Sequence, residues 1–195
     1  MRIQRLLNAD ERAAGLAVGL AMQGSLTNLA GGIMILSFKP FVVGDFISEG
    51  QYTGTVKSIN IFYTIISTPD NVKVVIPNGS LSNQTVANQS AYPLRRLALE
   101  FSASYNADAD LVIKTLLSIA ENNPMVNKET KPTANVKQHG DSAIIYVLSQ
   151  YCTQADYWNV HFYTQKKVKE EFDRLGIEIP FPQLDVHTYK DIPKS

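Results

Sequence analysis

The longest apolar stretch of the chain, Ala13–Phe38, follows a polar segment at residues 1–12 and contains no charged residue. As a helix at 1.5 Å per residue it would extend about 39 Å, which exceeds the ~30 Å hydrocarbon core of a bilayer. Pro40 cannot continue a helix and disfavours helical backbone at Lys39 before it. The pattern therefore predicts one membrane-spanning helix over residues 13–39.

Small side chains recur at intervals of four along this predicted helix, and such rows let neighbouring helices pack closely. The two rows are Gly15 with Gly19, and Ala17 with Ala21. Leu16 and Leu20 form a third row beside them. If several copies packed through the small rows, the leucines could face a shared axis and form a narrow apolar constriction, which can stop ions by dewetting. One helix cannot enclose a pore, so this interpretation requires a homo-oligomer.

Polar residues interrupt the middle of the stretch, and each needs a partner away from water. They are Gln23, Ser25, Thr27 and Asn28. Gly24 lies among them and is a candidate kink, because sharp bends gather at Gly/Ser sites. The composition alone also fits two other interpretations, a buried glycine-rich core helix of a soluble protein and an ordinary single membrane anchor.

Between residues 40 and 92 the pattern changes to short strands separated by Gly, Asn and Pro, which mark turns. The predicted strands are Asp45–Glu49, Gly54–Ile59, Phe62–Thr68, Val72–Ile76 and Thr85–Asn88. Strands of this length and spacing predict a small barrel-like β domain.

Residues 93–182 predict an α/β domain, and residues 183–195 predict a last strand and a tail. The predicted strands are Leu97–Tyr105, Val136–Gln138, Ala143–Tyr151 and Leu184–Tyr189. The predicted helices have Asp108 and Asp156 as N-caps, and Gly176 closes the second. The order β-α-β-β-α-β is that of a split βαβ, or ferredoxin-like, domain. In the second helix we expect four large apolar side chains in the core: Trp158, Phe162, Phe172 and Leu175.

The charge balance and the cysteine content argue against two classes of protein. Lys+Arg and Asp+Glu both number 18, so the formal net charge is zero. This balance argues against a dedicated nucleic-acid binder, which normally carries a basic excess. The single cysteine, Cys152, excludes an internal disulfide framework.

No residue pattern indicates an enzyme, a metal site or a cofactor site. The three histidines lack metal-ligand spacing with a cysteine or carboxylate: His139, His161 and His187. Cys152 has no suggested histidine partner, so we expect a small buried thiol. Three cations either line a vestibule and bias permeating ions or are ordinary surface charges: Lys57, Arg95 and Arg96.

Five motifs follow one another along the chain: GLAVGLAMQGSLTNLAGG at 15–32, KPFVVGDF at 39–46, VIPNG at 75–79, PLRR at 93–96 and IPFPQ at 179–183. Together they closely resemble the small-conductance mechanosensitive ion channel family. The resemblance implies a multipass homoheptamer in the bacterial inner membrane, with its C-terminal domains in the cytoplasm. Membrane tension opens such channels, which release ions and small osmolytes during hypo-osmotic shock. Membrane lipid is then a partner, whereas an enzymatic activity, a cofactor, a metal and nucleic acid are not implied.

The resemblance also implies an α+β membrane-associated fold and roles for particular residues. Leu16 and Leu20 match the family's two rings of gate leucines, and the small rows match its helix-packing surface. Gly24 matches the hinge that separates the pore half of the helix from the half along the membrane. Three further positions match that helix: Gln23, Asn28 and Gly32. The β domain resembles the family's Sm-like middle domain, and the last strand resembles one that joins other copies in a small barrel.

Family members carry two further membrane helices before the pore helix, whereas the polar residues 1–12 stand there in this chain. Those helices sense lipid tension in the family. This difference motivates an alternative function, in which the chain is a non-conducting cytoplasmic cage or assembly module, or a truncated channel fragment.

Overall fold

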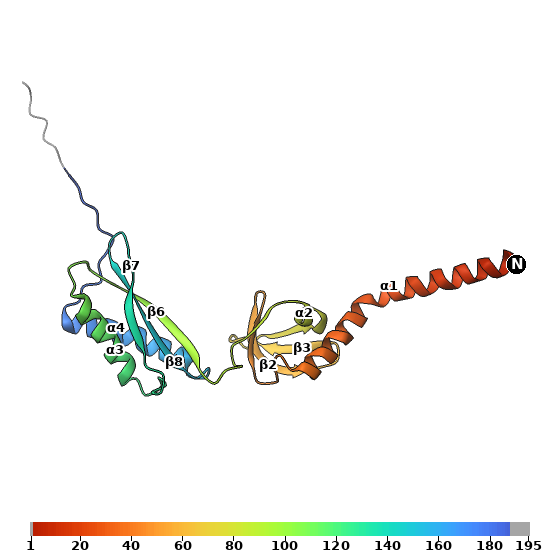
Figure 1. Cartoon of the computed structure of the whole chain (residues 1–195), viewed down its shortest axis with the longest axis horizontal. Helices are drawn as coiled ribbons and strands as arrows, with labels where there is room; N and C mark the ends of the chain where they lie inside the picture. The colour runs from red at the N-terminus through yellow and green to blue at the C-terminus, as the bar shows by residue number, and fades with distance from the viewer. Residues whose placement is uncertain (1, 188–195) are drawn as a thin grey trace, which may run out of the picture. The chain divides into compact units, whose positions relative to one another are not determined.

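The computed structural model of the chain describes the backbone of residues 2–187 and the side chains of residues 14–187. The chain divides into two compact units, Met1–Tyr92 and Pro93–Ser195. The first unit contains a long helix and a β domain, and the second is an α/β domain (Figure 1).

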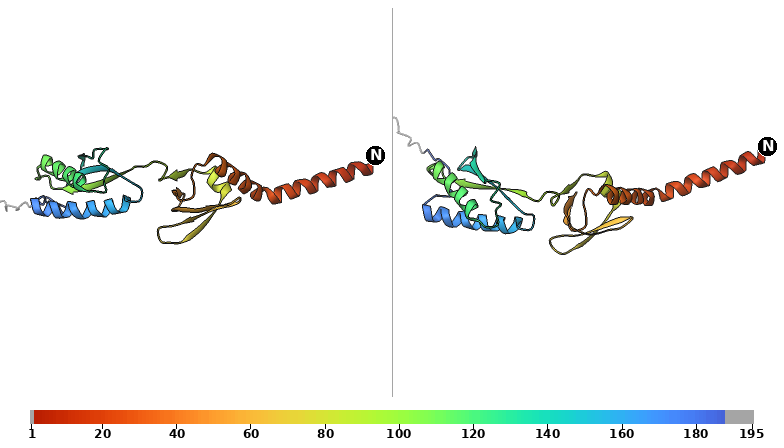
Figure 2. Two further views of the ribbon diagram at one scale, coloured as in Figure 1. Left: turned by 90° about the horizontal axis from the view of Figure 1, so that it is seen from below. Right: turned by 60° about the horizontal axis from the view of Figure 1, so that its bottom comes forward.

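The N-terminal helix α1 runs from Arg2 to Phe38 and is bent part-way along its length (Figures 1 and 2). It begins earlier than predicted, because residues 2–12 contain no glycine or proline and are rich in good helix formers. Inside α1, the Thr27 hydroxyl donates a hydrogen bond to the Gln23 carbonyl oxygen at 2.9 Å. Such bonds to the preceding turn often bend helices.

The β domain is a five-stranded antiparallel sheet in the order β4-β3-β2-β1-β5. Its strands are β1 Phe46–Glu49, β2 Tyr52–Ile59, β3 Tyr63–Ser67, β4 Lys73–Pro77 and β5 Val86–Asn88. A short helix, α2 Asn78–Asn83, follows β4 where the sequence predicted only a turn. The core of this unit joins sheet residues such as Ile47 and Ile66 to Ile35 of α1, so the end of α1 is part of the β domain.

The second unit is a three-stranded antiparallel sheet with two helices. Its elements are β6 Arg95–Ala103, α3 Ala109–Asn122, β7 Thr133–His139, β8 Ile144–Cys152 and α4 Tyr157–Leu175. The sheet order is β6-β8-β7, and alternate residues of β8 are buried. Those buried side chains form one core with α3 and α4. Gly176 ends α4 in the left-handed conformation (φ 68°), which confirms its predicted role as a C-cap.

Two expectations for this unit need correction. Residues 184–187 of the predicted last strand form no strand, and residues 188–189 lie outside the described residues. A strand requires a partner, and no element of the described chain pairs with these residues. The split βαβ pattern is therefore present with three of its four predicted strands in residues 93–187.

The second correction concerns α4, where Trp158 and Phe162 were expected in the core. They are 54% and 63% exposed. The buried stripe of α4 is formed instead by Val160, Thr164, Val168 and Phe172. These residues are spaced four apart. Trp158 and Phe162 are offset from them by two residues, about half a turn, and therefore lie on another side of the helix. Of the predicted core residues, Phe172 is buried and Leu175 is partly buried against the core.

The two predicted N-caps differ in the structure, which gives a matched test. An Asp108 carboxylate oxygen accepts hydrogen bonds from the backbone N–H groups of Asp110 (2.9 Å) and Leu111 (3.3 Å). Asp156 makes no such bond to α4. We expect Asp108→Ala to lower the free energy of opening the first turn of α3 by about 1 kcal/mol. Asp156→Ala should change the first turn of α4 by much less. Amide hydrogen exchange in the first turns of α3 and α4 measures the two effects. Equal effects would contradict the conclusion that Asp108 caps its helix through its side chain and Asp156 does not.

Candidate functional site

The first half of α1 carries the predicted gate and packing residues, and no other described part of the chain covers it. Leu16 and Leu20 are 65% and 63% exposed. The small residues of the two rows are exposed as well. A Cβ added at Gly15, Gly19 or Gly24 would have no atom within 4 Å. Residues Ala14–Phe38 are long and apolar enough to span a membrane. An apolar helix surface of this size is unfavourable in water, so it requires lipid or other protein around it.

The second half of α1 is docked on the β domain through glycine. A Cβ at Gly31 would lie 2.5 Å from the carbonyl oxygen of Asn78, and one at Gly32 would lie closer still to the carbonyl oxygen of Ile61. Both contacts are shorter than any side chain tolerates, so only glycine allows this approach of backbone to backbone. Ile35, one turn later, is buried in the core of the β domain.

Asn78 organises the surface on which α1 docks, and its side chain is fully buried. Its amide nitrogen donates to the carbonyl oxygens of Asn60 (2.7 Å) and Ile61 (3.0 Å). Its amide oxygen accepts a hydrogen bond from the Thr64 hydroxyl at 2.8 Å. These bonds hold the β2–β3 turn against the start of α2, because a buried amide must satisfy its hydrogen-bonding groups.

Asn28 links the two helices directly. Its side-chain oxygen accepts a hydrogen bond from the backbone N–H of Gly79 at 3.0 Å. That N–H lies in the first turn of α2, where the helix offers it no acceptor. Pro77, the N-cap of α2, provides no side-chain cap. Asn28 therefore satisfies a free N–H of α2 from another element.

The remaining predicted residues of this helix lie on the open side of the junction. Gln23 and Gly24 border an open groove of about 550 Å³ between α1 and α2, which Leu20 and Ser80 also line. The structure thus places Asn28 and Gly32 in the contact between α1 and the β domain. It leaves the leucines and the small rows exposed, and Gln23 and Gly24 lie beside the open groove. Sequence reasoning missed Gly31, Asn78 and Thr64. The VIPNG motif contains Asn78 and was the available signal.

The other candidate groups form no catalytic arrangement. Among residues 14–187, whose side chains the structure describes, no three His, Cys, Asp or Glu side chains are close enough together to hold a metal ion. His139 stacks on Tyr105, with 6.1 Å between the ring centroids. The Arg95 guanidinium lies 3.7 Å from the centre of the Tyr157 ring and donates to Gln154, so this cation has a structural role in the α/β domain.

Cys152 is buried, in agreement with the sequence interpretation. Burial raises the pKa of its thiol, and the nearby Asp156 carboxylate raises it further against the opposing effect of Arg95. A higher pKa reduces the thiolate fraction at neutral pH, and the thiolate is the reactive form.

Two family models match most of the chain. The model of the β-domain of mechanosensitive ion channels matches residues 24–91. The model of the C-terminal part of the mechanosensitive ion channel MscS matches residues 97–179. The two matches correspond to the β domain with the second half of α1 and to the α/β domain.

Curated relatives match over nearly the whole chain. An uncharacterized MscS family protein of Buchnera aphidicola (subsp. Schizaphis graminum) is 38% identical over 178 residues, which cover 91% of this chain and 63% of the relative. The small-conductance mechanosensitive channel of Edwardsiella ictaluri is 37% identical over 180 residues, covering 92% of this chain and 63% of the relative. The chain therefore spans about three-fifths of the length of these relatives.

Solved structures show the same fold. The crystal structure of Helicobacter pylori MscS in its closed state matches with a TM-score of 0.88 and 27% identity, covering 95% of this chain and 74% of that chain. The cryo-EM structure of Arabidopsis thaliana MSL1 matches with a TM-score of 0.74 and 18% identity, over 92% of this chain and 66% of that chain. The second likeness concerns the fold alone.

The docking contact can be tested with two glycine substitutions in the same helix. Gly32→Ala forces a side chain against the Ile61 carbonyl, so we expect it to destabilise the docked half of α1 by about 1–3 kcal/mol. Gly19→Ala meets open space and should leave the β domain unchanged. Amide hydrogen exchange in α2 and in the β2–β3 turn measures the effect. Unchanged exchange in Gly32→Ala would show that the close approach is not required.

The low reactivity expected of the Cys152 thiol can be tested by alkylation. We expect iodoacetamide to modify the native protein at pH 7 at least about tenfold more slowly than the same protein unfolded in guanidinium. As an exposed control, Gln165→Cys combined with Cys152→Ser should react at the rate of the unfolded protein. Mass spectrometry follows the modification. Fast labelling of native Cys152 would indicate an activated thiol and would reopen the possibility of an enzyme.

Proposed function

Because this chain belongs to the MscS family of mechanosensitive ion channels, we propose that it is one subunit of a homo-oligomeric channel. Membrane tension opens the channel, which releases ions and small osmolytes during hypo-osmotic shock. The family suggests seven subunits in a bacterial inner membrane, with the β and α/β domains in the cytoplasm. The observation that carries the proposal is an apolar helix half, with Leu16 and Leu20 between rows of small residues, that is exposed in the described part of the chain.

In the proposed assembly, the first halves of α1 from all copies surround one axis. The Gly15–Gly19 and Ala17–Ala21 rows let neighbouring helices approach closely. Leu16 and Leu20 then form two stacked apolar rings that exclude water and ions from a narrow pore. Lipid covers the outside of the helices, where their apolar surface is otherwise unsatisfied.

The second half of α1 has a different proposed role, which is to hold the pore against the β domain. Support comes from the glycine contact at Gly31 and Gly32 and from the Asn28–Gly79 hydrogen bond. Since this half is part of the β-domain core, opening requires the first half to move relative to it. Gly24 is the proposed hinge. A Cβ at this position would contact no other atom, so packing does not require glycine there, and its backbone flexibility is the remaining reason for it.

Leu20→Ser tests the gate. A hydroxyl in the apolar constriction favours water, so we expect a leaky channel that slows growth and opens at lower tension in membrane patches. Val18→Ser is the matched control, because Val18 is an equally exposed apolar residue of the same half but lies about half a turn away from the leucine row. It should conduct like the unmodified chain.

The two variants distinguish three possibilities. If Leu20→Ser behaves like the unmodified chain while both conduct, the gate assignment is wrong. If Val18→Ser leaks as strongly, the effect belongs to any polar residue in the helix. If neither the unmodified chain nor its variants conduct in cells lacking their own mechanosensitive channels, the cage or assembly module is the better description.

A further inference from the structure

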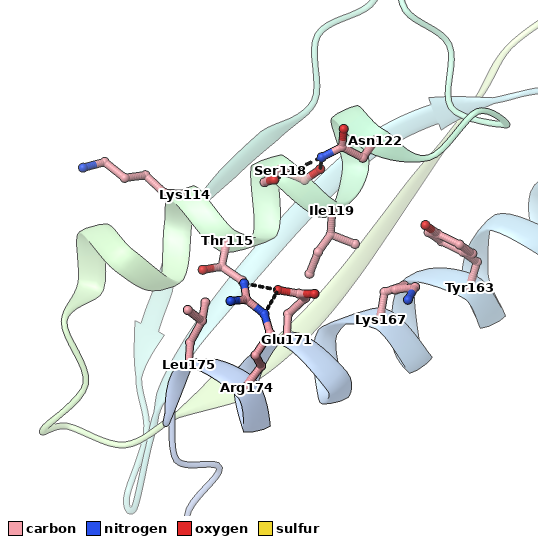
Figure 3. A pocket seen from close by; sticks show the side chains of 10 residues that line it. All are labelled: Lys114, Thr115, Ser118, Ile119, Asn122, Tyr163, Lys167, Glu171, Arg174 and Leu175. Carbon is pink, nitrogen blue, oxygen red and sulfur yellow. Dashed lines mark hydrogen bonds and ion pairs between the residues drawn. The ribbon is translucent and has the colours of Figure 1, made fainter.

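We propose that the groove between α3 and α4 binds an organic phosphate of metabolite size, with its phosphate at the Arg174 end. The groove has a volume of about 410 Å³, within the range of small-molecule sites. It is lined only by residues of these two helices (Figure 3). The proposed site therefore lies within the α/β domain and does not depend on the pore or on the proposed channel function.

The groove follows from how the two helices pack on the sheet. In α4, the row Tyr163, Lys167, Glu171 and Arg174 lies beside the buried stripe of the helix and borders the groove. In α3, Thr115 and Ile119 are more than nine-tenths buried and form part of its floor. Polar side chains thus rise on both sides of a partly apolar floor, and this mostly polar lining suits a charged, water-soluble ligand better than an apolar one.

Cationic side chains lie at one end and along one side of the groove, and two of the three are paired with neighbouring carboxylates. The lining contains three cations, Lys114, Lys167 and Arg174, and a single carboxylate, Glu171. Figure 3 shows the Arg174 guanidinium reaching from α4 toward Thr115 on α3, while Lys114 extends outward at the rim. Lys114 forms no ion pair with any residue in the described part of the chain. Its flexible side chain can fold over a bound anion.

Arg174 is held in place by hydrogen bonds to Glu171, but these bonds use only part of its N–H donors. Its Nε and Nη2 atoms donate to one oxygen of Glu171 at 2.9 and 2.6 Å. A guanidinium has five N–H donors, so three remain for a ligand. Lys167 donates to Glu170 at 2.7 Å, and this hydrogen bond raises the pKa of its ammonium group, which therefore stays charged. Donors of this kind pair with phosphate oxygens, and arginine does so in a bidentate manner.

The opposite end of the groove offers uncharged hydrogen-bonding groups. Asn122 donates to the carbonyl and hydroxyl oxygens of Ser118, at 2.9 and 3.2 Å. The amide oxygen of Asn122, the Ser118 hydroxyl proton and the Tyr163 hydroxyl remain for a ligand. Lys114 and Asn122 are eight residues apart in α3, about 12 Å along the helix. A phosphate at one end with a polar sugar or base at the other matches this length and distribution.

Adenosine monophosphate is a suitable probe, titrated by calorimetry into the full chain in lipid nanodiscs at fixed ionic strength. We expect saturable binding with one site per chain. Arg174→Gln and Lys114→Gln should each weaken it about tenfold. Adenosine, which lacks the phosphate, should bind at least about tenfold more weakly.

Lys169→Gln is the matched control for loss of one positive charge, because Lys169 pairs with Asp173 outside the groove. It should bind the probe like the unmodified chain, and circular dichroism checks the fold of each variant. The absence of saturable binding overturns the proposal. Equal weakening in Lys169→Gln and Arg174→Gln overturns the site, and inorganic phosphate binding as tightly as the probe overturns the assignment of a phosphate ester. Because binding is measured without ion conduction, a non-conducting chain that binds the probe contradicts only the channel function.

Discussion

The structure of the first unit depends on one close contact, in which the backbone of α1 touches the carbonyl oxygens of Asn78 and Ile61 at Gly31 and Gly32. No residue other than glycine permits this approach. The buried Asn78 side chain then keeps both carbonyls in place by bonding to the β2–β3 turn. Asn28 adds a hydrogen bond from α1 to α2. Through these contacts the last turns of a helix long enough to span a membrane become part of a domain built from antiparallel strands.

The two halves of α1 show how the same residue type serves different physical purposes. Gly31 and Gly32 remove atoms where another backbone must pass, whereas Gly15, Gly19 and Gly24 face empty space in the single chain. A glycine in open space weakens a helix by about 1 kcal/mol relative to alanine. Close helix packing or bending can offset that cost, and this is the basis of the proposed roles of these three glycines in an assembly.

In the α/β domain, the residues of α3 and α4 that form the core are different from those that carry charge on the surface. The inner positions of α3 and α4 are uncharged and mostly apolar, and they follow helical periodicity, so the core forms without any contribution from charge. The adjacent rows are free to carry charge, and several cations of α4 form ion pairs with acids one turn away. Surface pairs of this kind contribute little to stability. Of these cations, Lys167 and Arg174 line the groove between the two helices, and the others lie outside it.

Periodicity, turn residues and extended motifs are local signals, so the long apolar helix, the strand-rich middle segment, the α/β order and the family could be predicted from the amino-acid sequence alone. The roles of Leu16, Leu20 and Gly24 remain predictions of that kind. Only the tertiary structure showed that Asn78, Thr64 and Gly31 form the docking surface, since these residues are far apart in sequence and are joined by contacts that no local pattern encodes. It also moved Trp158 and Phe162 from the expected core to the surface. A spacing of four marks one side of a helix, and the packing of the sheet decides which side is buried.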